Sequence, residues 1–169
     1  MTKFFDDPKK LFQYIQQNVM ETLNDEVAEG VKDKQAEHVK KDVYDAYASQ
    51  DPYVKRRNGN DGLADPANMI HTVTSTVNGL ELFVKNIAKG NPNVYGTAPV
   101  EPPNYLAGII EYGRLPDRNG RYTTNKTGSQ DEYLSPRPFI SNTIEELRSS
   151  LEYVDWLRSG MRKRGFDVE

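Results

Sequence analysis

The chain has 169 residues, 36% of them hydrophobic and 28% charged, with a formal net charge of −3 at pH 7 and no cysteine. These values exclude disulfides and thiolate metal sites, and they give no global bias toward nucleic acid or an anionic membrane. No apolar run reaches the roughly 18 residues that a membrane-spanning helix needs, and the N-terminus lacks the features of a secretion signal. We therefore expect a soluble protein made inside the cell and folded as one domain over residues 1–169.

Residues 7–48 are predicted to be helical, because apolar residues recur there at spacings of three and four. Asp6 or Asp7 would cap the helix, with Pro8 at its first position. Gly30 costs about 1 kcal/mol relative to Ala inside a helix, which predicts a break or kink near it. The predicted apolar face comprises Leu11, Phe12, Ile15, Val19 and Leu23.

A β-hairpin at residues 69–88 is the clearest local prediction. Asn78-Gly79 suits a type I′ turn, in which both central residues have positive φ. A turn there would pair Val77 with Leu80 and Val73 with Val84, giving one mostly apolar face and one mixed face. A two-stranded hairpin alone is marginal, so its apolar face needs helices or further strands against it.

The C-terminal half alternates helix and loop. Residues 104–112 predict a short helix that Gly113 ends in the left-handed conformation. Residues 114–134 form a polar loop of unusual length, which is typical of loops that contact something. A final helix is predicted from about Pro138 to Arg164. Its apolar stripe consists of Ile140, Ile144, Leu147, Leu151, Val154, Leu157 and Met161.

These elements together predict the α+β class. An antiparallel sheet that includes the 69–88 hairpin would pack on helices, with a long N-terminal helical region and a long C-terminal helix.

No set of residues forms a reactive cluster. His38 and His71 fall in different elements, which favours surface or hydrogen-bonded structural roles over a metal site. Residues 58–62 are rich in Asn and Gly but have the wrong spacing for a phosphate loop or a calcium loop, and serine-hydrolase motifs are absent. We therefore expect a protein that is not an enzyme and that holds no cofactor or metal.

Several short motifs follow one another along the chain. They are Tyr53-Val54-Lys55-Arg56-Arg57, Gly62-Leu63-Ala64-Asp65-Pro66-Ala67-Asn68-Met69, the hairpin, Ile109-Ile110-Glu111-Tyr112-Gly113 and Pro136-Arg137-Pro138-Phe139-Ile140. Their order and spacing resemble the neck or tail-completion proteins of long-tailed bacteriophages, also described as head–tail joining or minor capsid proteins. The similarity covers roughly residues 25–155, so that residues 1–24 would be an N-terminal helical extension of a family-like core over residues 25–164.

The resemblance implies an α+β fold and a structural virion protein. Such a protein forms a homo-oligomeric ring, typically hexameric, that joins the DNA-filled head connector to the tail tube. Its partners would be head connector or head-closure proteins and the tail terminator or tail tube protein. Packaged DNA would pass through the lumen without sequence-specific binding, and no membrane would be involved. The protein would be made in the bacterial cytoplasm and reside in the virion.

Two alternatives remain open. One is a tail terminator protein, which caps the tail tube and has a similar architecture. The other is a small nucleic-acid-binding protein that uses Lys55-Arg56-Arg57 and Arg162-Lys163-Arg164 to contact phosphates.

The candidate interface surrounds the entry to the final helix. Pro136 and Pro138 stiffen this segment and hold Arg137 extended, and arginine and aromatic residues carry much of the contact energy at interfaces. Phe139 is either such an interface residue or a core residue, and Arg137 is either an interface residue or a surface cation. The candidate interface residues are Glu111, Tyr112, Arg137, Phe139, Arg56 and Arg57.

Overall fold

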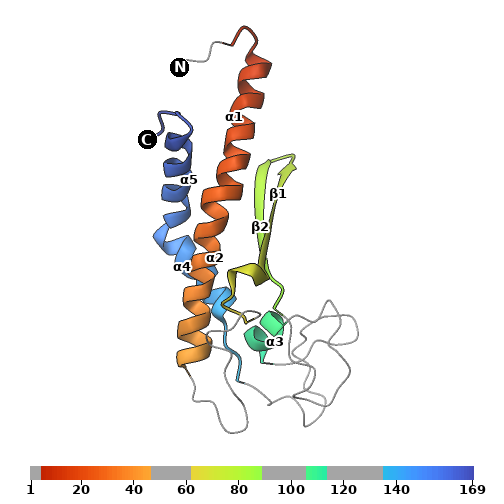
Figure 1. The fold of residues 1–169 in the computed structure, drawn as a ribbon, viewed down its shortest axis with the longest axis vertical. Coiled ribbons are helices and arrows are strands. Elements are labelled where there is room, and N and C mark those ends of the chain that lie inside the picture. The colour runs from red at the N-terminus through yellow and green to blue at the C-terminus, as the bar shows by residue number, and fades with distance from the viewer. Residues whose placement is uncertain (1–4, 47–61, 89–105, 114–134) are drawn as a thin grey trace. The chain divides into compact units, whose positions relative to one another are not determined.

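The computed structural model describes residues 5–46, 62–88, 106–113 and 135–169 (Figure 1). These residues confirm the predicted α+β class, because helices at both ends of the chain accompany an antiparallel hairpin. They group into two compact units, one from residues 1–31, 71–84 and 150–169 and the other from residues 32–70 and 85–149. In the described part of the chain, no helix has both the length and the apolar character needed to cross a membrane.

The N-terminal helical region begins at Pro8, and Asp7 caps it by accepting a hydrogen bond from the Lys9 N–H at 2.8 Å. Helical residues then continue to Asp45, alternating between α-helical and π-helical segments. The segments are α1 (Pro8–Thr22), the π-helical η1 (Leu23–Val27), α2 (Ala28–His38) and the π-helical η2 (Val39–Asp45). The predicted helix is therefore present as far as the structure describes it, but the predicted break near Gly30 is wrong.

Gly30 lies inside α2 because a side chain there would collide with Trp156 of helix α5 (Glu152–Lys163). A Cβ atom added to Gly30 would lie 2.5 Å from both Cδ2 and Cε3 of the Trp156 ring, far inside van der Waals contact. Glycine is thus needed here for close packing. Trp156 is half-buried against this glycine.

The face of α1 that packs on α5 differs from the predicted apolar face. Thr22 is fully buried, and its hydroxyl donates to Asn18 O at 2.8 Å and lies 3.4 Å from Met161 Sδ. A small side chain that satisfies its own hydroxyl lets the two helices, which lie side by side in Figure 1, approach closely. By contrast, Leu11 is 39% exposed and Phe12 is 70% exposed, so the predicted apolar face is not buried along its whole length.

The hairpin consists of β1 (Met69–Thr76) and β2 (Gly79–Asn86), which form a two-stranded sheet. The connection is therefore Val77-Asn78, one residue earlier than predicted. Only Gly79 has a positive φ in this turn, at 134°, so the expectation of positive φ at both Asn78 and Gly79 is wrong.

The hairpin register also differs from the prediction. The Ile87 N–H donates to Asn68 O at 2.7 Å, and together with the position of the turn this places Val73 opposite Leu82 rather than opposite Val84. The shift is by two residues, and an even shift leaves every side chain on its own face. The predicted alternation is confirmed over the middle of the strands, whereas Ser75 and Val77 are exposed and Thr76 and Lys85 are half-buried. Half-buried positions include Val73, Leu80, Leu82 and Val84, and exposed positions include Thr72, Thr74, Glu81 and Phe83.

The half-buried face of the hairpin is turned toward the N-terminal helical region. Gln16 of α1 donates to the Ser75 hydroxyl at 3.3 Å. His71 is hydrogen-bonded to Asn24 of η1 through Nε2 at 3.1 Å. Both bonds come from β1 residues on that face, so the opposite face points away from α1.

The second unit has its own hydrophobic core, which brings together η2, α3 (Leu106–Tyr112) and α4 (Phe139–Ser150). The 3-10 turn η3 (Pro66–Asn68) leads from this unit into β1. Gly113 follows α3 with φ at 66°, as predicted. The buried core residues are Val39, Val43, Leu63, Ala88, Ala107 and Phe139.

The predicted continuous C-terminal helix is broken at Leu151. This residue separates α4 from α5 and has φ 57° and ψ 19°, in the left-handed region. That conformation costs a non-glycine residue roughly 1–2 kcal/mol. The apolar spacing continues through Leu147, Leu151 and Val154, so periodicity alone does not reveal the break.

The Gly30–Trp156 contact gives a testable prediction. We expect Gly30→Ala to lower the free energy of unfolding by about 1–3 kcal/mol, because the added methyl group overpacks the contact with the indole. Without the contact, the same change in a helix would stabilise it by up to about 1 kcal/mol. Urea unfolding of Gly30→Ala, Trp156→Ala and the double variant measures the coupling. A destabilising Gly30→Ala in the Trp156→Ala background would contradict this packing.

Candidate functional site

The candidate interface residues fall into two groups. Arg56 and Arg57 lie outside the described residues, as does the predicted loop at 114–134. The other four belong to the second unit, where the end of α3 meets the segment leading into α4. The structure brings these four near one another but gives them different surroundings.

Glu111 is buried and caps the start of α4. Its side chain is 4% exposed. The Ile140 N–H donates to Oε2 at 2.8 Å, and the Ser141 N–H donates to Oε1 at 3.0 Å. The Ser141 hydroxyl donates to the same Oε1. A carboxylate at a helix N-terminus satisfies N–H groups that have no partner inside the helix, so Glu111 faces the interior of the unit rather than a partner.

Phe139 belongs to the hydrophobic core of the second unit. Its side chain is fully buried and packs with the residues of η2 and α3. Of the two roles that the sequence left open for Phe139, the structure supports the core role.

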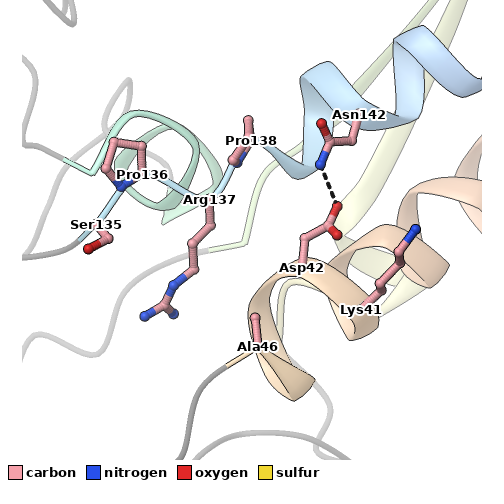
Figure 2. Close-up of a pocket in the computed structure, with 8 residues that line it drawn as sticks. All are labelled: Lys41, Asp42, Ala46, Ser135, Pro136, Arg137, Pro138 and Asn142. Carbon is pink, nitrogen blue, oxygen red and sulfur yellow. Dashed lines mark hydrogen bonds between the residues drawn. The ribbon is translucent and has the colours of Figure 1, made fainter.

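Tyr112 and Arg137 are the candidate residues with access to solvent. Tyr112 is 50% exposed. The Arg137 N–H donates to Ile110 O at 3.0 Å, which ties the segment before α4 to helix α3. The Arg137 side chain borders an open hollow (Figure 2). The residues that line the hollow are Lys41, Asp42, Ala46, Ser135, Pro136, Arg137, Pro138 and Asn142.

A polar network behind this hollow joins α2 and η2 to α4. The buried His38 ring is hydrogen-bonded through Nδ1 to Asp42 Oδ2 and through Nε2 to Glu146 Oε2, both at 2.9 Å. Asn142 donates to Asp42 Oδ2 at 2.9 Å, a bond drawn in Figure 2. Both ring nitrogens of His38 are thus engaged in contacts within the second unit.

Glu146 is the charged end of this network. Lys34 Nζ donates to Glu146 Oε1 at 2.9 Å. That hydrogen bond is the main cause that lowers the pKa of the Glu146 carboxyl below its ordinary value of 4.5, with a smaller contribution from His38 and against an opposing effect of desolvation. The network therefore holds Glu146 in its ionised form.

The basic group at the end of α5 is engaged within the first unit. Arg164 Nη1 donates to both carboxylate oxygens of Glu26, at 2.9 and 2.8 Å, and Nη2 donates to Asp25 at 2.7 Å. Arg162 donates to Val168 O at 2.8 Å through Nη2. These contacts make the C-terminal basic group part of the folding of this unit.

Sequence reasoning missed the His38 network. The sequence does indicate the part of the network on the N-terminal helical region, because Lys34, His38 and Asp42 recur at a spacing of four and must share one helix face. Nothing local connects that face to Glu146 or Asn142, which lie about a hundred positions further along the chain. In the described residues, no group of three or more His, Cys, Asp or Glu side chains is arranged to hold a metal ion.

Comparison with known proteins identifies the class to which this fold belongs. A family model matches the chain over residues 7–163, which is nearly its whole length. The match indicates a protein of phage origin. The chain belongs to the YomN family, which is phage-derived and of the Bacillus prophage type. No curated protein and no solved structure matches it.

The cap on α4 predicts a contrast between two neighbouring residues. We expect Glu111→Ala to lower the free energy of unfolding by about 2 kcal/mol, because it leaves partly buried donors at the start of α4 without an acceptor. Tyr112→Ala removes a half-exposed ring and should cost less than about 1 kcal/mol. Urea unfolding followed by circular dichroism compares the two. Equal and small losses would show that Glu111 does not cap α4 in solution.

The lowered pKa of Glu146 predicts a dependence of stability on pH. Since the folded pKa lies below the unfolded value, ionised Glu146 stabilises the chain above pH 4.5, and this contribution is lost as the pH falls through the folded pKa. Glu146→Gln should therefore be less stable than wild type at neutral pH, with the difference closing in acid. Urea midpoints measured from about pH 7 to pH 3 test this. Glu145→Gln, at an exposed neighbouring position, is the control and should follow wild type, whereas parallel curves for Glu146→Gln and wild type would refute the assignment.

Proposed function

We propose that this protein is a structural component of the phage neck, where copies form a ring that joins the DNA-filled head connector to the tail tube. In this role it completes the tail and resides in the virion after synthesis in the host cytoplasm. Its partners are further copies of itself, head connector or head-closure proteins, and the tail terminator or tail tube protein.

The observation that carries the proposal is membership of a phage-derived family over residues 7–163. The ordered motifs from residue 53 to residue 140 support the neck within the wider range of phage structures. The α+β fold of the described residues agrees with what that resemblance implies.

Exposed apolar side chains support a role in assembly. Phe12 on α1, Phe83 on β2 and Tyr112 on α3 are all large and at least half exposed. Large apolar side chains that remain exposed in a single chain are often covered when the chain joins a partner. A protein whose work is to bind other copies and other proteins needs such surfaces.

The polar contacts support a role without catalysis. His38 is held by two carboxylates, and Glu111 serves as a helix cap. The polar contacts of His38 and Glu111 thus lie within the fold. We therefore propose no enzymatic activity and no cofactor.

The contacts of Arg164 weigh against the alternative of a nucleic-acid-binding protein. This guanidinium pairs with Glu26 and Asp25, so its charge is offset within the chain. With a net charge of −3, the chain suits a channel along which DNA slides rather than a surface that grips it.

Deletion of the gene from a phage that carries it tests the proposal. Loss of a neck protein should leave DNA-filled heads and tails of normal length that fail to join. Cryo-electron microscopy of complete particles should then show the chain as a ring between the connector and the tube.

Other outcomes discriminate the alternatives. Tails of irregular or excess length would indicate a tail terminator protein. Particles that lack the chain, or normal joining without it, would overturn the structural role. A steep salt-dependent affinity of the isolated chain for DNA would favour the nucleic-acid-binding alternative.

A further inference from the structure

Strand β2 carries a side-chain pattern that is complementary to itself. On the face turned away from α1, Glu81, Phe83 and Lys85 follow one another as acid, aromatic and base. Phe83 at the centre is 64% exposed. When two copies of such a strand run antiparallel about Phe83, each acid meets a base and the aromatic residue meets itself.

The hairpin register makes the outer edge of β2 suitable for this pairing. The hydrogen bond from Ile87 to Asn68 fixes which backbone groups point inward, since bonded residues alternate along an antiparallel ladder. The N–H and C=O groups of Phe83 and its odd-numbered neighbours point toward β1. Those of Leu80, Leu82 and Val84 therefore point to the outer edge.

Among the described residues, no third strand pairs with β2 and no backbone–backbone hydrogen bond from another element reaches its outer edge. A two-stranded sheet is marginally stable, and a strand edge with exposed backbone groups accepts a further strand. The edge thus offers the backbone groups that a second copy would need.

We propose that the β2 strands of two copies pair antiparallel about a two-fold axis at Phe83, joining two hairpins into a four-stranded sheet. Leu82 then lies opposite Val84 of the second copy, and these residues exchange backbone hydrogen bonds from the outer edge. Phe83 lies opposite Phe83 of the second copy as a non-hydrogen-bonded pair, in which Cα atoms approach to about 4.5 Å and side chains are closest.

Charge complementarity identifies a second copy of this chain as the occupant of the edge. In this register Glu81 lies opposite Lys85 of the second copy, and the two-fold axis repeats the pair. Opposite charges and aromatic residues placed directly across a sheet stabilise it. The corresponding face of β1 carries Ile70, Thr72 and Thr74 and offers no such charge pair.

This contact goes beyond the proposed ring. A two-fold contact uses the same surface on both copies and closes after two, so it cannot by itself build a ring of higher order. The proposal therefore describes a dimer of the free chain, and its test does not depend on the test of the neck function.

Charge reversal measured by analytical ultracentrifugation tests the pairing. Glu81→Lys and Lys85→Glu should each weaken dimerisation by about tenfold, because each places like charges opposite one another twice. The double variant restores both pairs in exchanged order and should return to within about threefold of wild type. Glu145→Lys changes the net charge as Glu81→Lys does, at an exposed position on α4, and should leave dimerisation unchanged. A wild-type chain that stays monomeric, or a double variant that is not restored, would overturn the proposal.

Cross-linking gives an independent readout, since the native chain has no cysteine. Phe83→Cys should form a disulfide-linked dimer on mild oxidation, because partners across this register lie within the Cα separation of about 4.4–6.8 Å that disulfides need. A mixture of Glu81→Cys and Lys85→Cys should cross-link faster than either alone. Thr74→Cys, exposed on the same face but on β1, is the control. Cross-linking of Thr74→Cys as fast as Phe83→Cys would contradict a two-fold contact through β2, and circular dichroism confirms that each variant is folded.

Discussion

The arrangement of the second unit depends on one buried carboxylate. Glu111 lies next to the last residue of helix α3 and accepts hydrogen bonds from the Ile140 and Ser141 N–H groups at the start of α4, so the end of one helix fixes the beginning of the next. Because α4 begins there, Phe139 enters the core and the side chains of Tyr112 and Arg137 lie at its edge. A buried charge is costly unless it is hydrogen-bonded, and here the helix N-terminus supplies those bonds.

In the first unit, small residues of the N-terminal helical region make room for large side chains of α5. Gly30 admits the Trp156 ring, and the buried Thr22 lies against Met161. Only 36% of the chain is hydrophobic, and helices that approach closely need fewer large residues between them. Phe12 stays exposed, although its spacing places it on the apolar side of the helix.

The sequence predicts what depends on local pattern and misses what depends on contacts between distant residues. The faces of the hairpin follow from alternation, which an even shift in register does not change. The position of the turn is not predicted correctly, because Gly79 takes its positive φ at the start of β2 rather than inside the two-residue connection. Helix propensity alone makes Gly30 look like a weak point of its helix, whereas the structure shows that it makes room for the Trp156 ring. In the candidate site, helix propensity finds the end of α3 at Gly113, but the role of Glu111 follows from Ser141, thirty residues later.

Leu151 lies between helices α4 and α5 and has a left-handed backbone conformation. Helix α4 is fixed within the second unit by Glu111 and by the His38 network, and α5 is fixed within the first unit by Trp156 and Arg164. A left-handed leucine persists only where the contacts around it offset its cost. Helix α4 before Leu151 and helix α5 after it are each held by packing and by hydrogen bonds to charged groups. Along the chain, the break at Leu151 falls between the helix held by these second-unit contacts and the helix held by these first-unit contacts, and the apolar spacing alone gives no sign of it.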